Sequence, residues 1–371
     1  MDLATVAARE AIKRAGVAPA EFDHVIFGNA LQTSGDALYG ARHVALRAGV
    51  PIEVPALTVN RLCGSGMQSI VSGAQLMQLG EAKMVLAGGM ESMSQAPHVI
   101  RGMRWGVGLG EGKLEDSLMV ALFDSYCGLQ MANTAELYAE QQGITREAMD
   151  ELALRSQRLA GEAQKACRLG EEITPVPLKN RKGEATGEMF DKDDHLRPET
   201  TPEALAKLRP SFGKNGTVTA GNASGIVDGG AAVVLTSLAD AEKRGLNPMG
   251  RIVSWGIAGV DPKIMGSGPV PASKLALEKA GLKLEDMDLI ELNEAFAAQA
   301  LAVVKELGIP LEKLNVNGGA IALGHPLGAT GTRLVITLLY ELCRRKARYG
   351  LATACIGGGQ GIAMIVENLR R

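Results

Sequence analysis

Strand-like and helix-like segments alternate along this chain, and no other feature restricts its fold as strongly. Residues 24–31, 53–60 and 82–89 have the composition of strands, and apolar residues recur at helical spacing over 67–80. A further helical segment, 8–16, ends at a glycine. Strands that alternate with helices form parallel sheets with helices on both faces. The sequence therefore predicts an α/β fold.

The C-terminal part of the chain repeats this pattern. The predicted elements are strands over 250–259, 287–293, 351–356 and 361–368 and helices over 271–281 and 329–345. Residues 11–30 align without gaps on residues 276–295, with identical residues at Ala11/Ala276, Ala15/Ala280, Gly16/Gly281, Asp23/Asp288 and Ala30/Ala295. A duplicated βαβ unit explains both observations.

A segment of different character separates the two copies. It is richer in Gly, Met and charged residues and contains helical stretches. We expect it to be a loop domain that covers the active site on one face of the core. The predicted domains are an N-terminal half over 1–92 plus 227–247, the loop domain over 93–226, and a C-terminal half over 248–371.

Composition excludes several classes of partner. The net charge of −2 gives no reason to expect nucleic acid or an anionic membrane surface. No apolar run approaches the length that a transmembrane helix needs, and the first residues lack the apolar region of a signal peptide. The five cysteines are scattered and odd in number, so they do not form a disulfide framework. We therefore expect a cytoplasmic protein.

Reactive side chains stand where predicted strands end, which is where open α/β sheets bind their ligands. Cys63 lies between a strand and a helix and is flanked by Gly64 and Gly66, and a helix N-terminus there favours a thiolate. His325 precedes another helix and can act as a general base toward a thiol. The combination points to a cysteine nucleophile with a histidine base.

Two more strands end in residues of this kind. Cys355 is followed by three glycines, whose backbone N–H groups can form an oxyanion hole. Asn293 ends a strand just before a predicted helix that starts at Glu294. Each residue also has a structural interpretation: a buried thiol for either cysteine, a surface side chain for His325 and a helix N-cap for Asn293. Their joint occurrence at equivalent sheet positions favours a catalytic site.

Motifs along the whole chain resemble those of the thiolase family, and most closely those of its acetyl-CoA acetyltransferase branch. They are NRLCGSGMQS, GGMESMSQAPH, TVTAGNASG, GVDPKIMGSGPVPAS, NEAFAAQA, NVNGGAIALGHPLGATG and CIGGGQGIA. The resemblance implies two similar halves that form five layers, α-β-α-β-α, with a loop domain over the active site. It also implies a homodimer or a dimer of dimers, coenzyme A (CoA) thioesters as substrates, and neither a bound cofactor nor a metal.

The resemblance assigns a role to each matching residue. It makes Cys63 the acyl-enzyme nucleophile, His325 the base that activates it, and Cys355 the acid/base that exchanges a proton with the α-carbon of acetyl-CoA. Asn293, through a water, and His325 would bind the enolate oxygen. The backbone N–H groups of Cys63 and Gly357 would bind the acyl carbonyl oxygen. Residues implied in binding CoA or lining the pocket are Arg197, Ser224, Leu122, Met131, Phe212, Ala220, Met265, Ala295 and Phe296.

The chain departs from the family pattern in two places. Gln130-Met131-Ala132 stands where the family usually has His-Met-Gly, which affects the expected acyl-chain preference. The first copy also begins at its helix, so its opening strand is missing. By analogy with the second copy and the family, we expect that strand to belong in the middle of its sheet and the natural protein to start upstream of Met1. The alternative is that another segment fills the gap.

Other functions remain open at this stage. A ketoacyl synthase has this fold and a Cys nucleophile but pairs it with a second His or an Asn, where Cys355 stands here. A cysteine hydrolase would use Cys63 and His325 without Cys355. A zinc site from these residues would lack the short-range ligand pairs typical of structural zinc. A non-catalytic CoA-binding or scaffold protein would result if the missing strand disabled the fold.

Overall fold

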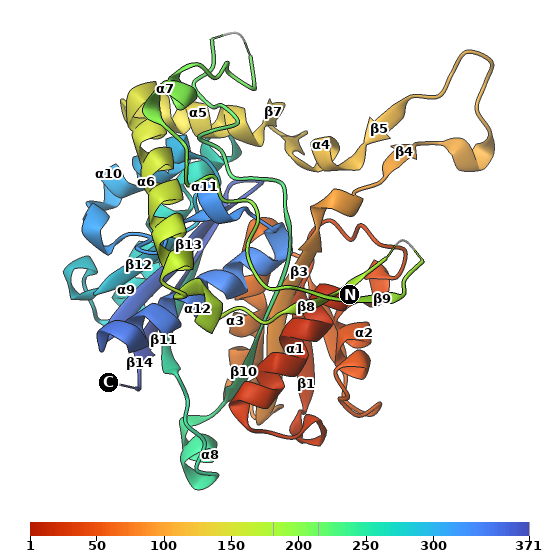
Figure 1. The fold of residues 1–371 in the computed structure, drawn as a ribbon, viewed down its shortest axis with the longest axis vertical. Helices are drawn as coiled ribbons and strands as arrows, with labels where there is room; N and C mark the ends of the chain where they lie inside the picture. Colours follow the sequence, from red (N-terminus) through yellow and green to blue (C-terminus); the bar gives the residue numbers. More distant parts are fainter. Residues whose placement is uncertain (181, 214, 371) are drawn as a thin grey trace.

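The computed structural model describes residues 1–180, 182–213 and 215–370. Two α/β halves lie side by side, each built on a four-stranded sheet (Figure 1). The first sheet has the order β10–β3–β1–β2 and the second the order β11–β14–β13–β12. The strands are β1 (His24–Gly28), β2 (Ala56–Val59), β3 (Met84–Ser92), β10 (Asp228–Thr236), β11 (Gly250–Gly259), β12 (Leu289–Leu292), β13 (Tyr349–Ile356) and β14 (Gln360–Asn368).

Helices cover both faces of each sheet. Between the sheets lie α3 (Ser65–Gln78) and α12 (Leu327–Arg345), which pack against one another. The outer face of the first sheet carries α1 (Asp2–Ala15) and α2 (Gly40–Arg47), and that of the second carries α9 (Pro269–Ala280) and α10 (Ala297–Leu307). The result is the predicted five-layer arrangement, α-β-α-β-α.

The two halves share their strand pairings and the contacts that support them. In each half the last strand, β10 or β14, runs antiparallel to its neighbour, β3 or β13. Before β1, the Asp23 carboxylate accepts the backbone N–H groups of Lys83 at 2.7 Å and Met84 at 2.9 Å. Before β12, the Asp288 carboxylate accepts those of Arg348 at 2.7 Å and Tyr349 at 3.0 Å. The Asp23/Asp288 identity therefore reflects a duplicated structure.

Glycines allow the two central helices to touch near their N-termini. A Cβ atom at Gly66 in α3 would lie 2.7 Å from the backbone N of Thr332 in α12. A Cβ atom at Gly331 in α12 would lie 2.3 Å from the backbone N of Met67 in α3. Only glycine permits so close an approach of two backbones. The contact brings together the helix starts that carry Cys63 and His325.

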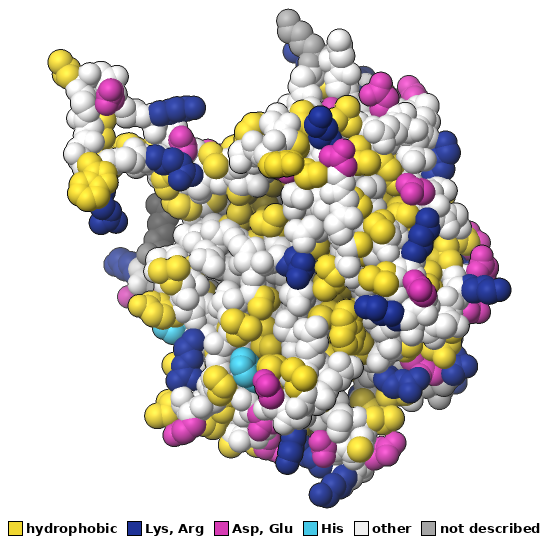
Figure 2. Space-filling view, turned by 180° about the vertical axis from the view of Figure 1, so that it is seen from behind, with side chains coloured by type: hydrophobic (Ala, Val, Ile, Leu, Met, Phe, Trp, Pro, Cys, Tyr) yellow, Lys and Arg dark blue, Asp and Glu magenta, His cyan; other side chains and the backbone are white. Residues whose placement is uncertain are grey.

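The region between the halves contributes two helices to the core and one projecting arm. α5 (Met131–Gln141) and α6 (Arg146–Lys165) pack on the second half, where Tyr138 and Met149 are fully buried. The arm consists of β4 (His98–Ile100), β5 (Leu114–Asp116) and the residues between them, and it extends away from the body of the molecule (Figure 1). Figure 2 shows apolar, basic and acidic side chains along the arm.

The expected position of the missing strand was wrong. In the second half the corresponding strand is β11, which lies at the edge of its sheet beside β14. The equivalent place in the first half is the outer edge of β10, not the middle of the sheet. An edge strand has a single neighbour, so fewer backbone groups depend on it for hydrogen bonds than on a central strand.

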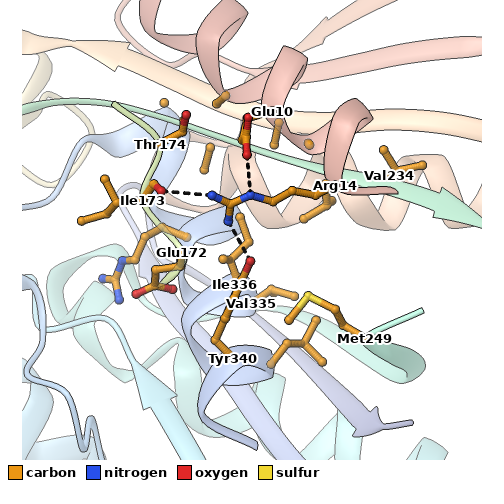
Figure 3. Close-up of a pocket in the computed structure, with 18 of the residues that line it drawn as sticks. Glu10, Arg14, Glu172, Ile173, Thr174, Val234, Met249, Val335, Ile336 and Tyr340 are labelled. Carbon is orange, nitrogen blue, oxygen red and sulfur yellow. Dashed lines mark hydrogen bonds and ion pairs between the residues drawn. The ribbon is translucent and has the colours of Figure 1, made fainter. Parts of the chain in front are cut away.

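A cavity of about 700 Å³ lies along that edge of β10, between α1 and α12 (Figure 3). Apolar side chains such as Val234, Met249 and Ile336 line it, and Arg14 of α1 reaches across it. The Arg14 guanidinium donates hydrogen bonds to Tyr340 Oη at 2.8 Å and to the carbonyls of Glu171 at 2.8 Å and Ile173 at 3.1 Å. This side chain joins helices from opposite faces of the sheet.

Leu311–Lys313 form a 3-10 turn, and an isolated bridge joins the next residue, Leu314, to Ile290 of the second sheet. One smaller prediction differs from the structure. The helix expected from Glu294 begins at Ala297, with Phe296 as its N-cap. Asn293 therefore does not cap that helix and remains available for another role.

Candidate active site

A strained turn presents Cys63 at the start of α3. The preceding residue, Leu62, has a φ of 45°, which a side-chain-bearing residue rarely adopts. The turn is held by Asn60 Oδ1, which accepts the Leu62 N–H at 2.9 Å, and by Ser65 Oγ, which accepts the Arg61 N–H at 2.8 Å. These contacts fix the direction of the Cys63 side chain.

The turn after β13 lies against the Cys63 turn. The backbone N–H of Gly357 donates a hydrogen bond to the Cys63 sulfur, and Arg61 Nη1 donates to Gln360 Oε1 at 2.9 Å. Cys355, at the end of β13, is fully buried and close enough to Cys63 for the two charges to interact. The structure thus places the Cys63 thiol beside the Gly357 N–H, with the buried Cys355 thiol close to Cys63.

His325 enters this space from the segment before α12. Its ring is buried, and its Nδ1 lies 2.7 Å from Thr330 Oγ1. The amide nitrogen of Asn293 lies 3.3 Å from His325 Nε2, and Asn293 itself is fully buried at the end of β12. Leu327, two residues after His325, packs in the same apolar cluster as Cys63. The four residues, far apart in the sequence, therefore lie in one region at the ends of three strands and two helices.

Burial determines the protonation of these groups. It raises the pKa of Cys63 to about 11, against the opposing effect of the Gly357 N–H, and raises the pKa of Cys355 well above its ordinary value. Burial and the charge of Arg333 lower the pKa of His325 to about 3. The free protein therefore holds two neutral thiols and a neutral imidazole at pH 7.

Burial opposes the Cys63 thiolate that the helix N-terminus was expected to favour. The helix N-terminus and the Gly357 N–H favour the anion, but removal of the sulfur from water outweighs both. The Cys63 proton must therefore leave during the attack on a substrate, and His325 is the neutral base in this group of residues.

Comparison with known proteins identifies the family. The profile described as "Thiolase, N-terminal domain" matches residues 1–239, and the profile described as "Thiolase, C-terminal domain" matches residues 246–368. The chain belongs to the thiolase family. Human mitochondrial 3-ketoacyl-CoA thiolase is 53% identical over 368 residues, which cover 99% of this chain and 92% of the human protein. An acetyl-CoA acetyltransferase of Shinella zoogloeoides is 51% identical over 359 residues, which cover 96% of this chain and 90% of that protein.

Solved structures agree with this assignment. The crystal structure of human mitochondrial 3-ketoacyl-CoA thiolase in complex with CoA matches with a TM-score of 0.95 and 52% identity, and the match covers 99% of this chain and 91% of the human one. The predicted thiolase fold is therefore confirmed. No helix in the described part of this thiolase is both long and apolar enough to cross a membrane.

An apolar cluster surrounds Cys355 in this thiolase and is where the resemblance expects the pocket. Five of the predicted lining residues pack together there: Leu122, Met131, Met265, Ala295 and Phe296. Leu122 also contacts the cluster that contains Cys63. The segment before α5 therefore lies over both thiols, at the place expected for an acyl group.

Two other predicted binding residues, Ser224 and Arg197, lie outside this cluster. The Ser224 backbone N–H donates to the Ala295 carbonyl at 3.0 Å, so Ser224 borders the pocket. Arg197 is exposed, and its guanidinium donates to the carbonyls of its own loop, at 2.9 Å for His195. The His195 ring lies against Gly225, which places that loop beside Ser224.

Phe212 and Ala220 stand outside the pocket cluster. Phe212 packs against the large core of the second half, and its carbonyl accepts the Asn133 amide at 3.3 Å. Ala220 is exposed. Neither residue belongs to the Cys355 cluster, so their assignment to the pocket stays a prediction.

Two residues that border the site were missed in the sequence. Thr330 contacts His325. It lies five residues after His325 in the first turn of α12, and this position was the sequence feature that could have indicated the contact. Glu91, at the end of β3, accepts the backbone N–H groups of Ala30 at 3.0 Å, Leu31 at 3.1 Å and Gly328 at 2.9 Å. Glu91 thereby joins the first half to the start of α12.

Proposed function

We propose that this thiolase catalyses the reversible Claisen condensation of two acetyl-CoA molecules to acetoacetyl-CoA and CoA, through an acyl group on Cys63. The observation that supports it most directly is the arrangement of the two thiols: Cys63 beside the Gly357 N–H, and Cys355 buried next to it. A hydrolase has no use for the second thiol. A scaffold protein has no use for the convergence of Asn293 and His325 on the same space.

In the thiolysis direction, Cys63 attacks the 3-keto carbonyl and its proton passes to His325 Nε2. The oxyanion that forms is stabilised by the backbone N–H groups of Cys63 and Gly357. When the C–C bond breaks, the enolate oxygen is held by the imidazolium of His325 and by Asn293, through a water. The enolate carbon takes the proton of the Cys355 thiol, which releases acetyl-CoA.

The second half returns every proton. CoA gives its thiol proton to the Cys355 thiolate, and the CoA sulfur attacks the acyl group on Cys63. The Cys63 sulfur leaves and regains its proton from His325. This cycle starts from two neutral thiols and a neutral imidazole, the state that burial favours in the free protein. Condensation is the reverse of this sequence.

The burial of Cys355 suits the proton transfer to carbon. An α-hydrogen of a thioester is a very weak acid, so the base that removes it must be strong. Burial raises the pKa of Cys355, which makes its thiolate a stronger base than an exposed one. The same burial keeps bulk water from protonating the enolate.

The acyl pocket supports a short-chain substrate. Its lining of Met131, Met265 and Phe296 leaves Cys355 fully buried. Gln130 replaces a ring with a flexible amide beside Met131, and its buried Oε1 atom has no hydrogen-bond partner. We propose acetoacetyl-CoA as the preferred substrate, with some tolerance of branched or longer chains. Rates with acetoacetyl-CoA, 3-ketohexanoyl-CoA and 3-ketooctanoyl-CoA test this, and a preference for the longest would place the enzyme in the degradative branch.

CoA itself would be bound at the mouth of the site. Ser224, beside Ala295, would contact the pantetheine, and Arg197 would contact the nucleotide end once its guanidinium leaves the carbonyls of its loop. The net charge of −2 gives no reason to expect nucleic acid as a partner. Weaker CoA binding by Arg197→Ala, with the acyl-transfer rate unchanged at saturation, is the expected result.

Self-association is part of the proposal. The arm between β4 and β5 exposes Trp105, Leu109 and Leu114, with Trp105 at 90% exposure (Figure 2). β2 is the terminal strand of its sheet and exposes Leu57. Both features fit a homodimer or a dimer of dimers. Analytical sedimentation of the purified protein tests the oligomeric state. We also propose a cytoplasmic location, on the basis of five free cysteines, and cell fractionation tests it.

One assay separates the candidate functions. Acetoacetyl-CoA should be consumed only when free CoA is added, and the product should be acetyl-CoA. Consumption without added CoA would indicate a hydrolase. Absence of turnover in the folded wild-type protein would favour a scaffold.

A further inference from the structure

The contacts of His325 assign a role to a residue that does not touch the substrate. Thr330 is fully buried one turn into α12, and its Oγ1 lies 2.7 Å from His325 Nδ1. The same oxygen lies 3.0 Å from the Pro326 carbonyl, to which it donates. A hydroxyl has a single hydrogen, so an Oγ1 that donates to Pro326 must accept from Nδ1–H.

The Asn293 Nδ2 atom lies 3.3 Å from His325 Nε2 and 3.5 Å from Nδ1, so this contact does not distinguish the two nitrogens. A neutral imidazole has one N–H and one lone pair, so a Thr330 hydroxyl that donates to Pro326 places the N–H on Nδ1 and the lone pair on Nε2. That tautomer is the one a general base at Nε2 requires.

We propose that Thr330 is a positioning residue, which holds His325 as its Nδ1–H tautomer and so keeps the Nε2 lone pair directed at the Cys63 proton. The inference rests on the proposed acyl transfer for its kinetic consequence, but the tautomer itself is independent of activity. Because the partner of Nδ1 is a neutral hydroxyl, it orients the ring without adding a negative charge that would retain the proton. The imidazolium formed during acylation can therefore return its proton readily.

Three variants test the role. Thr330→Val keeps the shape of the side chain and removes the hydroxyl, and Thr330→Ser keeps the hydroxyl. Thr332→Val is the matched control, since Thr332 is equally buried in α12 and its hydroxyl donates to the Gly66 carbonyl at 2.9 Å, away from the ring. Acylation of Cys63 by acetyl-CoA is measured in a rapid-quench experiment, and the ring nitrogens are observed by ¹⁵N NMR of the histidine-labelled proteins. The chain has five histidines, so the His325 signals are assigned by difference from His325→Ala.

We expect the wild-type spectrum to show a protonated Nδ1 and an unprotonated Nε2. Thr330→Val should mix the two tautomers and slow acylation by about tenfold or more, because a buried N–H loses its acceptor. Thr330→Ser and the Thr332→Val control should keep the wild-type tautomer. An Nε2–H tautomer in the wild type, or unchanged acylation in a folded Thr330→Val protein, would overturn the proposal. Failure of the wild type to become acylated at all would instead refute the proposed function.

Discussion

The side-chain nitrogen of Asn293 lies 3.3 Å from Nε2 of His325, although 32 residues separate them in the chain. Asn293 ends β12, and His325 precedes α12, so the contact spans the inner face of the second half. The Asn293 Oδ1 atom is buried and has no hydrogen-bond partner in the described chain. An amide oxygen kept in this condition beside a base is suited to accept a hydrogen bond from a water, which can in turn donate to an oxyanion.

Loss of the Asn293 amide should affect one half of the reaction more than the other. Asn293→Ala removes a donor to the enolate oxygen, so kcat for thiolysis of acetoacetyl-CoA should fall by about 10²–10³. Acetylation of Cys63 by acetyl-CoA uses the other pair of donors and should change much less. A steady-state assay and rapid-quench acylation give the two values, and equal losses in both would show that Asn293 is not specific to the enolate step.

The protonation of His325 predicts the pH dependence of acylation. Its pKa is lowered to about 3, so the basic form is present at all higher pH values and is not lost as pH falls through the ordinary histidine range. We expect the acylation rate constant to show no acid limb between about pH 5 and pH 8. Rapid-quench measurements over this range check it. A decline with an apparent pKa near that of free histidine would mean that the ring is charged in the resting enzyme.

The two thiols should separate cleanly by mutation. Cys355→Ser retains the volume of the side chain but is a far weaker acid, so condensation and thiolysis should be lost while Cys63 still accepts an acetyl group. Acetyl-enzyme formation is followed by intact mass, and turnover by the loss of acetoacetyl-CoA. Cys127→Ser, outside both the Cys63 and the Cys355 clusters, is the control and should retain both activities. Loss of acylation in Cys355→Ser would disprove the division of roles.

Arg14 should contribute to stability through its bridge across the β10 edge. Arg14→Met removes hydrogen bonds to Tyr340 and to two backbone carbonyls. We expect the free energy of unfolding to fall by about 1–2 kcal/mol. This is less than three separate hydrogen bonds would give, because the Arg14 side chain is partly exposed to water. Arg9→Met is the matched control on the same helix, since within the described residues the Arg9 guanidinium donates hydrogen bonds only to the Arg47 carbonyl. Urea unfolding of both proteins gives the comparison. A smaller loss for Arg14→Met than for Arg9→Met would show that the bridge carries little free energy.

Local patterns were enough to predict the positions of the reactive groups. Asn293 and Cys355 stand at the ends of β12 and β13, and the carboxyl ends of neighbouring parallel strands meet at one side of a sheet. Cys63 follows β2, a strand of the other sheet. The Asp23/Asp288 identity likewise marked a contact that recurs in both halves. These features depend on short segments, so their sequences were sufficient.

Properties that depend on tertiary packing were not predictable. The raised pKa of Cys63 results from the apolar groups that exclude water from it, which no motif reports. The edge position of β11 is set by its pairing with β14. This pairing joins residues more than 100 positions apart in the sequence, such as Gly250 and Asn368. The contact between Thr330 and His325 depends on how the chain turns into α12. Arg197 folds back on its own loop, which its sequence context did not indicate.

The most direct test of the whole account is the site of acylation. Wild-type protein is incubated with acetyl-CoA, quenched in acid, digested and analysed by peptide mass spectrometry, with Cys63→Ser and Cys127→Ser treated in parallel. We predict one acetyl group on the peptide that contains Cys63 in the wild type and in Cys127→Ser. The Cys63→Ser protein should carry none and lose nearly all turnover, since a serine hydroxyl is far less ionised than a thiol. An acetyl group on Cys355 in place of Cys63, or full turnover by a folded Cys63→Ser protein, would contradict the account.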